Sequence, residues 1–201
     1  MSPMLERLTH RQILITVGPV SLPGDLAAPA PASGAVIFAH GSGSSRLSPR
    51  NIQVARTLNQ AGLATLLFDL LTPAEAIDRG NVFDIALLAA RLGAATDWLR
   101  GQAEVRGLSV GYFGASTGVA AALWAAAQPG ARVAAIVSRG GRPAEAEKYV
   151  DLALSRFKLY TMHDPVFAPN WHRIAEIHLA RQQFDLAIEA FNLSEYYRVP
   201  V

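Results

Sequence analysis

The sequence has 201 residues, is 51% hydrophobic and 17% charged, carries a formal net charge of +2 and contains no cysteine. This length suits one ordinary domain or two small ones, and the composition excludes collagen-like, intrinsically disordered and disulfide-stapled proteins. The basic residues do not cluster, which argues against nucleic acid or an anionic lipid as a partner. No apolar run reaches the roughly 18 residues of a membrane span, and Glu6 and Arg7 stand where a signal peptide would be apolar. We therefore expect a soluble cytoplasmic protein.

The composition changes abruptly near residue 143. All 16 glycines lie at or before Gly141, whereas nine of the 16 aromatic residues lie in the 58 residues from Ala144 to Val201. A turn-forming run, Gly140–Pro143, stands between the two kinds of sequence. We therefore predict a glycine- and alanine-rich core over residues 1–143 and a helical segment over residues 144–201.

Strand and helix signals alternate along the first segment. Apolar runs predict strands over Ile13–Val20, Ala35–Ala39, Leu63–Leu70, Leu108–Phe113 and Val133–Val137. Helices are predicted over Pro49–Gln60, Asn81–Arg100 and Thr117–Gln128. Strands that are apolar throughout and alternate with helices of crossover length predict an α/β fold, with a doubly wound, mostly parallel sheet covered on both faces.

The turn before the last predicted helix carries the clearest chemical signal. Gly114–Gly118 reads GASTG and has the form G-x-S-x-G, between a predicted strand and a predicted helix. In a nucleophile elbow the serine sits on a strained turn, and small residues two positions away on each side let the backbones approach closely. A plain tight turn between strand and helix is the alternative interpretation. We predict that Ser116 is a nucleophile at such an elbow.

A glycine-rich loop, His40–Ser45, follows an earlier predicted strand. Backbone N–H groups of such a loop and of Thr117 could together hold a tetrahedral oxyanion. A phosphate-binding loop is the competing interpretation, but no Gly-Lys-Ser/Thr sequence follows and neither loop has the form G-x-G-x-x-G. His40 precedes the serine and sits at a strand end, so we expect it to shape the loop. Asp69, at the end of another predicted strand, is expected to cap a loop.

Four stretches of the first segment resemble the dienelactone-hydrolase-like group of α/β-hydrolases. These stretches are Ala35–Asn51, Thr65–Thr72, the turn around Ser116 and Ala135–Pro143. The resemblance covers about residues 34–143 and implies a serine hydrolase that acts on a small ester or lactone, with no metal or organic cofactor. It also implies Ser116 as the nucleophile, Thr117 as one oxyanion donor, and Ser42 or a loop neighbour such as Gly41 as the other.

The acid and the histidine of such hydrolases are missing from their usual places. Hydrolases of this group continue with two more strands, the acid following the first and the histidine following the second. After Pro143 the sequence has no further β-rich apolar run and no Gly-x-x-His loop. A serine without a general base is a weak nucleophile. We therefore expect low activity, and the second interpretation is a non-catalytic scaffold derived from a hydrolase.

The second segment could supply a triad only from its own residues. Chain order permits Ser116, then Glu145, Glu147 or Asp151, then His163. His163 lies in a predicted loop between helices, which makes it the candidate base. His172 and His178 are six residues apart and would point to different helix faces, which argues against a shared metal site.

The second segment also has an internal period. Ala153 and Ala187 are 34 residues apart, and so are Phe157 and Phe191, which matches the tetratricopeptide period. Only about one and a half repeats are present, whereas a solenoid usually needs about three. We expect this tetratricopeptide-like segment to cover the edge of a truncated sheet or to bind a protein partner.

Overall fold

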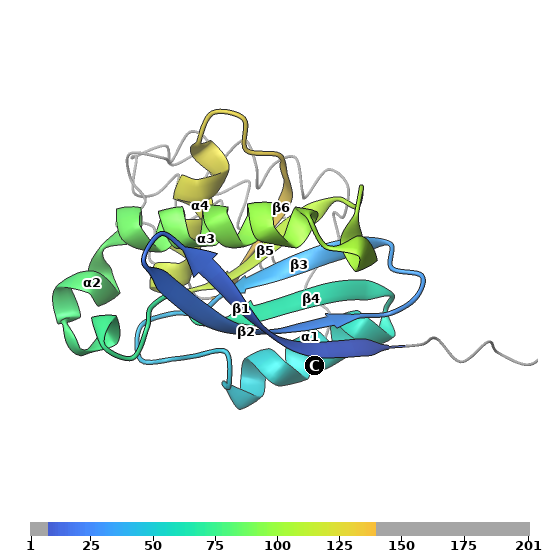
Figure 1. Cartoon of the computed structure of the whole chain (residues 1–201), viewed down its shortest axis with the longest axis horizontal. Helices are drawn as coiled ribbons and strands as arrows, with labels where there is room; N and C mark the ends of the chain where they lie inside the picture. The colour runs from blue at the N-terminus through green and yellow to red at the C-terminus, as the bar shows by residue number, and fades with distance from the viewer. Residues whose placement is uncertain (1–7, 140–201) are drawn as a thin grey trace, which may run out of the picture.

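The computed structural model describes residues 8–139, which form a mixed sheet with helices on both faces (Figure 1). Six strands are hydrogen-bonded in the order β1-β2-β4-β3-β5-β6. They are β1 (Thr9–Val17), β2 (Val20–Ala28), β3 (Gly34–Ala39), β4 (Leu63–Phe68), β5 (Val110–Ala115) and β6 (Val133–Arg139). β2 is antiparallel to both of its neighbours, and β4, β3, β5 and β6 are parallel. The predicted α/β class with a mostly parallel, doubly wound sheet is thus confirmed.

The helices divide between the two faces of the sheet. They are α1 (Pro49–Gln60), α2 (Arg79–Phe83), α3 (Ile85–Arg100) and α4 (Thr117–Ala127), with short 3-10 turns η1 (Glu75–Ile77) and η2 (Ala103–Val105). α1 lies on one face, and α3 and α4 lie side by side on the other (Figure 1). Successive strand residues point to opposite faces, so Ile37 enters the larger core under α3 and α4, whereas Phe38 packs with Ala55 of α1.

α4 approaches the sheet closely because its sequence is built from small residues. Nearly all of the helix is buried, and alanines dominate it. A Cβ atom at Gly118 would overlap the carbonyl oxygen of Ala39, so only glycine fits in this first turn. The amino end of α4 is therefore held against the carboxyl end of β3.

The N-terminal region differs from the prediction. Instead of one strand over Ile13–Val20, β1 and β2 form a hairpin whose turn contains Gly18 with φ +58°. Pro23 in β2 made this region read as a turn, since proline disfavours strands. The carbonyl of Pro23 accepts the N–H of Asp69 just beyond the end of β4. The N–H that proline lacks would face the same side, so the missing bond falls at the very end of the β2–β4 ladder.

The single helix predicted over Asn81–Arg100 is also wrong in one detail. The chain breaks at Asp84 (φ −76°, ψ 88°) into α2 and α3. The Asp84 carboxylate accepts the backbone N–H of Leu87 over 3.0 Å, which is the bond of a helix N-cap. The aspartate was thus the signal for a helix start inside an otherwise continuous apolar pattern.

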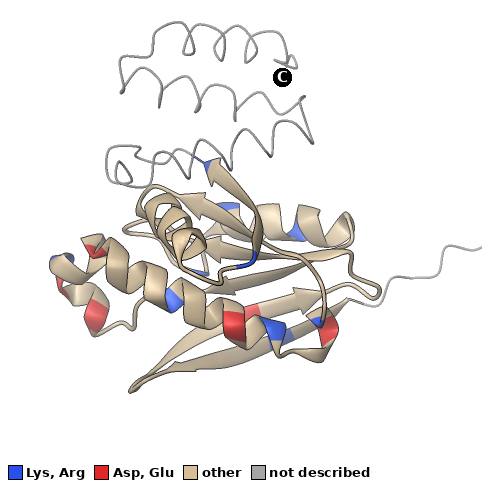
Figure 2. Cartoon of the chain, turned by 90° about the horizontal axis from the view of Figure 1, so that it is seen from above, with Lys and Arg blue, Asp and Glu red and all other residues tan. Residues whose placement is uncertain are grey.

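Two further expectations concern charge and chain organisation. The arginines of the described residues are spread over several elements and do not gather on one of them (Figure 2). Both lysines, Lys148 and Lys158, lie outside residues 8–139. Within residues 8–139, no helix has the length and apolar character needed to cross a membrane. The predicted boundary at 143 and the tetratricopeptide-like segment over 144–201 lie outside the described residues and stay predictions.

Candidate active site

Ser116 occupies a strained turn between β5 and α4. Its backbone has φ +51° and ψ −123°, and it is the one non-glycine residue with positive φ in the described part of the chain. Such a conformation costs on the order of 1–3 kcal/mol and persists only where the surroundings enforce it. Here the surroundings are tight, because a Cβ atom at Gly114 would lie 2.9 Å from Cα of Val119. The Ser116 side chain is thus held at the carboxyl edge of the sheet, at the amino end of α4.

The glycine-rich loop after β3 runs directly against Ser116. A Cβ atom at Gly41 would come within 2.9 Å of the Ser116 Cβ and 2.8 Å of the Ala115 carbonyl oxygen. One residue later, the backbone N–H of Ser42 donates a 3.1 Å hydrogen bond to Oγ1 of Thr117. The residue Thr117 is 1% exposed. The structure therefore brings together four residues that sequence analysis singled out, Gly41, Ser42, Ser116 and Thr117.

Arg46 ties the same loop to two strands. Its backbone N–H donates to Asp69 Oδ1 over 2.8 Å, and its guanidinium pairs with Asp69 at the end of β4. The guanidinium Nε also lies 3.3 Å from Oδ2 of Asp25 in β2. All three side chains are largely buried, so this ion-pair cluster anchors the loop. The loop-capping role expected for Asp69 is confirmed, whereas sequence analysis gave Arg46 no role.

His40 is held as a neutral structural residue. Its Nδ1 donates to the Gly41 carbonyl over 3.1 Å, and its Nε2 accepts the Leu70 N–H over 3.1 Å, an assignment that uses both ring nitrogens. Burial lowers the pKa of His40, although the Gly41 carbonyl and the Asp69 charge oppose the shift. His40 thus links the ends of β3 and β4 and shapes the loop, as its position in the sequence led us to expect.

A cavity of about 280 Å³, which we call the loop cavity, opens beside these groups. One wall is the glycine-rich loop with Thr117. The facing wall is mostly hydrocarbon and consists of Leu70, Leu71, Pro73, Ala76, Val82 and Leu88, with Thr72 among them. The Thr72 hydroxyl donates to the Glu75 carboxylate. Ser116 does not line the cavity itself, but Gly41 and Thr117 do, and Gly41 lies directly against Ser116.

A buried arginine supports the facing wall. Arg91 of α3 is 8% exposed, pairs with Glu75 over 2.8 Å and donates to the Val17 carbonyl at the hairpin turn over 3.0 Å. Glu75 also accepts the backbone N–H and the hydroxyl of Thr72. The Thr72 N–H is the main reason that the pKa of Glu75 is lowered, with Arg91 contributing less. No sequence signal pointed to this pair, because its members lie 16 residues apart on different elements.

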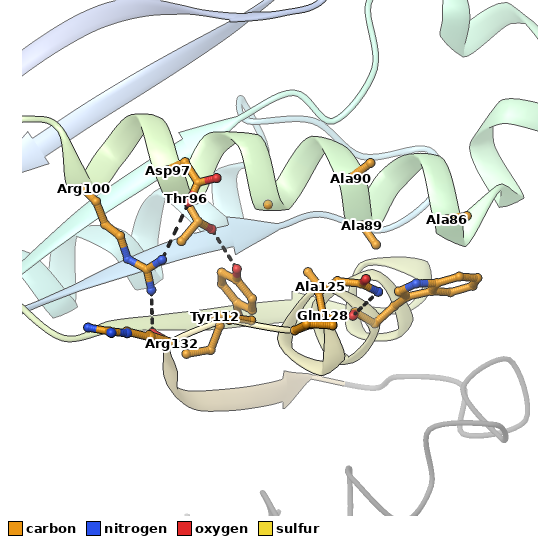
Figure 3. Close-up of a pocket in the computed structure, with 16 residues that line it drawn as sticks. Ala86, Ala89, Ala90, Thr96, Asp97, Arg100, Tyr112, Ala125, Gln128 and Arg132 are labelled. Atoms are coloured by element: carbon orange, nitrogen blue, oxygen red, sulfur yellow. Dashed lines mark hydrogen bonds and ion pairs between the residues drawn. The ribbon is translucent and has the colours of Figure 1, made fainter.

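A larger cavity of about 480 Å³ lies at the other end of the sheet, between α3, α4 and the start of β6 (Figure 3). The Tyr112 hydroxyl is 2.7 Å from Thr96 Oγ1, and Arg100 donates to the Arg132 carbonyl over 2.6 Å. Burial raises the pKa of Tyr112, so its phenol remains protonated at neutral pH. Size alone would favour this cavity over the loop cavity as the candidate active site. Its polar groups, however, already bond to one another, and the strained serine is elsewhere.

The remaining predicted site residues are not among those described. His163 and the candidate acids Glu145, Glu147 and Asp151 fall outside residues 8–139, so their place relative to Ser116 stays a prediction. Within the described ranges, no three histidine, aspartate or glutamate side chains come together as a metal site.

Comparison with known proteins gives both curated relatives and solved structures. No family model matches the chain. Two curated proteins from Mycobacterium tuberculosis strains CDC 1551 / Oshkosh and ATCC 25618 / H37Rv, provisionally named phosphoribosyl transferases, are each 57% identical over 136 residues. That match covers 68% of this chain but only 31% of each relative, so the chain spans about a third of their length.

Two solved structures resemble the chain more completely. A dienelactone hydrolase-like promiscuous phosphotriesterase from metagenomic libraries is 29% identical, with a TM-score of 0.56 over 67% of this chain and 59% of its own. A dienelactone hydrolase from Anabaena variabilis ATCC 29413 is 55% identical, with a TM-score of 0.67 over 71% of this chain and 68% of its own. Sequence identity of that level over two thirds of a solved enzyme, together with the shared sheet, shows that this chain belongs to the dienelactone hydrolase-like family of α/β-hydrolases.

Proposed function

We propose that the chain is a serine hydrolase acting on an ester or lactone, with Ser116 as the nucleophile. The observation that carries this proposal is the backbone of Ser116, whose positive φ is maintained between Gly114 and Gly118 at the amino end of α4. A serine held this way has its hydroxyl at the open edge of the sheet, where it can attack a carbonyl carbon. Membership of the dienelactone hydrolase-like family supports the same reaction class.

The negative charge that develops on the carbonyl oxygen would be stabilised by backbone N–H groups. The N–H of Thr117 stands at the amino end of α4, and the N–H of Ser42 lies beside it on the glycine-rich loop. The Ser42 N–H donates to the Thr117 hydroxyl in the absence of substrate, so it would exchange that partner for the oxyanion. One positioned backbone donor is commonly worth about a hundredfold to a thousandfold in rate. Gly41 contributes by allowing the loop to approach Ser116.

The general base must come from outside the described residues. Of the two histidines within them, His40 uses both ring nitrogens in the fold, and His10 lies on β1 with its side chain 59% exposed beside Asp25. We propose that His163 is the base if one operates in this chain, and that turnover is otherwise slow. Losing triad members typically costs several orders of magnitude in rate.

A non-catalytic scaffold with a tetratricopeptide-like interaction segment is the alternative proposal, and reactivity at Ser116 separates the two. Wild type, Ser116→Ala and His163→Ala are compared for labelling by an alkyl fluorophosphonate and for hydrolysis of p-nitrophenyl acetate. The hydrolase proposal requires labelling that Ser116→Ala abolishes, with slow ester turnover. Labelling unchanged by Ser116→Ala contradicts it and favours the scaffold. Turnover of several per second that is lost in both variants would contradict the expected low activity and identify His163 as the base.

A phosphoribosyl transferase activity is not proposed for this chain. The Mycobacterium tuberculosis proteins that carry the name are matched over only 31% of their length. A match of 136 residues in a chain of 201 includes the serine turn, and a hydrolase accounts for that turn directly.

A further inference from the structure

The loop cavity begins at the groups proposed to hold the carbonyl. Gly41, Ser42 and Thr117 belong to its wall, and Gly41 is the residue that lies against Ser116. A carbonyl carbon at the Ser116 hydroxyl, with its oxygen toward these N–H groups, therefore has the mouth of the cavity next to it. One substituent of that carbon would enter the hollow between the loop and the facing wall.

The facing wall is apolar and firmly positioned. Leu70 and Leu88 are 1% and 3% exposed, and both belong to the main core. Leu71 and Val82 complete the hydrocarbon surface from the segment between β4 and α3. Glu75 and Arg91 hold that segment, since their ion pair joins η1 to α3. A hydrocarbon group placed here would be removed from water on one side by aliphatic side chains.

The ionisable groups of the described lining are already paired. They are His40 and Asp69. The Asp69 carboxylate accepts from the backbone and the guanidinium of Arg46, and His40 is neutral with both nitrogens bonded. A carboxylate or ammonium entering this lining would lose hydration without gaining a counter-charge, which is strongly unfavourable.

We propose that the loop cavity binds an uncharged hydrocarbon substituent of the ester and disfavours a charged one. This inference rests on the proposed function, because the cavity is a substrate subsite only if Ser116 reacts with a carbonyl. At about 30 Å³ for each water-sized group, a volume of about 280 Å³ has room for about nine such groups, which is enough for a chain of six carbon atoms. The substrate class is thus a short, neutral ester or lactone.

Simple amides test the cavity, because they mimic the ester group but do not acylate a serine. Binding to the full chain is measured by ligand-observed NMR titration for acetamide, hexanamide and adipic acid monoamide, which has the hexanamide chain ending in a carboxylate. Hexanamide is expected to bind at least tenfold more tightly than either of the others. N-Butylacetamide carries its chain on the leaving-group side of the amide. Tighter binding of hexanamide than of N-butylacetamide would assign the cavity to the acyl part of the ester, and the reverse order would assign it to the alcohol part.

A matched pair of variants locates the binding. Ala76→Phe places an aromatic ring at a position that lines the cavity, whereas Ala74→Phe makes the same change two residues earlier, outside the lining. Both alanines are exposed, so the two variants are matched in exposure. Hexanamide affinity should fall at least tenfold in Ala76→Phe and stay within twofold of wild type in Ala74→Phe. Equal affinities for the three amides, or no effect of Ala76→Phe, would overturn the inference.

Fluorophosphonate labelling of the same samples separates this inference from the proposed function. Ser116 labelling without amide selectivity contradicts the cavity assignment and leaves the hydrolase proposal standing. Amide selectivity without labelling contradicts the hydrolase proposal, and with it the role of the cavity as an ester subsite.

Discussion

The backbone N–H of Ser42 donates to the hydroxyl oxygen of Thr117 across 3.1 Å, and the two residues are 75 positions apart. This bond joins the loop after β3 to the first turn of α4, the two elements proposed to hold an oxyanion. Before substrate binds, the Thr117 hydroxyl therefore occupies the direction in which the Ser42 N–H points. It keeps the N–H oriented and satisfied at the edge of the cavity.

The first prediction concerns this hydroxyl. Thr117→Val preserves the shape of the side chain but removes the acceptor, so the Ser42 N–H loses its partner and the loop loses its tie to α4. We expect the rate constant for fluorophosphonate labelling of Ser116 to fall by about tenfold or more, by analogy with the loss of a positioned oxyanion donor. Thr117→Ser keeps the hydroxyl and should stay within about threefold of wild type. Equal labelling by Thr117→Val and wild type would show that the bond does not position the loop.

The second prediction concerns the anchor of the glycine-rich loop. Arg46→Met retains much of the side-chain length but leaves the largely buried carboxylates of Asp25 and Asp69 without their guanidinium. We expect the free energy of unfolding to drop by about 1–3 kcal/mol in urea denaturation, because buried charges lose their partner. Arg50→Met, at an exposed position of α1, should change it by less than about 0.5 kcal/mol. Similar losses in both variants would mean that the cluster does not stabilise the fold.

The third prediction follows from the neutral state of His40. Burial lowers its pKa in the folded protein below the ordinary value of 6.5, so below that pH the unfolded chain binds a proton that the folded chain resists. The free energy of unfolding should therefore decrease as the pH falls below 6.5, at most by about 1.4 kcal/mol per pH unit from this group. The decrease ends once the pH is below the folded pKa.

His40→Gln isolates that dependence. Glutamine offers a donor and an acceptor but does not titrate. The unfolding free energy of the His40→Gln variant should therefore vary less between pH 7.5 and 5 than that of wild type. The control is His10→Gln, which makes the same substitution at the other described histidine, at an exposed position. Parallel pH curves for wild type and His40→Gln would contradict the assignment of a buried neutral imidazole.

The fourth prediction concerns Glu75. Its pKa is lowered mainly by the backbone N–H of Thr72, and Arg91 adds to the effect, so its ionised form stabilises the folded state. That contribution is fully present above the ordinary pKa of 4.5 and is lost as the pH falls through the lowered value. Glu75→Gln should cost about 1–3 kcal/mol of unfolding free energy at pH 7, and the difference from wild type should shrink below pH 4.5.

A matched control for Glu75 is Glu104→Gln, whose partner Arg11 has its side chain 45% exposed. Exposed ion pairs contribute about 0–1 kcal/mol, so this variant should differ little from wild type at any pH. A pH-independent difference between wild type and Glu75→Gln would show that the charge of Glu75 is not what stabilises the segment between β4 and α3.

The sequence by itself determined the order of most strands and helices and the position of the serine turn. Apolar runs of strand length and helical spacing are local patterns, and each parallel strand was predicted to within a few residues. The turn at Ser116 could also be predicted, because G-x-S-x-G is a local pattern and the requirement for glycine at 114 is imposed by the nearby backbone of Gly118 and Val119. The requirement for glycine at 118 comes instead from the Ala39 carbonyl at the end of β3. The hairpin was missed since Pro23 is a poor strand residue in general, and it is tolerated here only because its missing N–H faces the end of β4.

Only the tertiary structure decided which side chains support the candidate site. Arg46 meets Asp25 from β2 and Asp69 from β4, Arg91 meets Glu75 and the hairpin turn, and Ser42 meets Thr117 across the sheet edge. None of these pairs has a characteristic sequence spacing, because the members belong to elements brought together by the order of strands in the sheet. Hydrogen bonds and ion pairs act over about 3–4 Å, so their partners are set by packing rather than by distance along the chain.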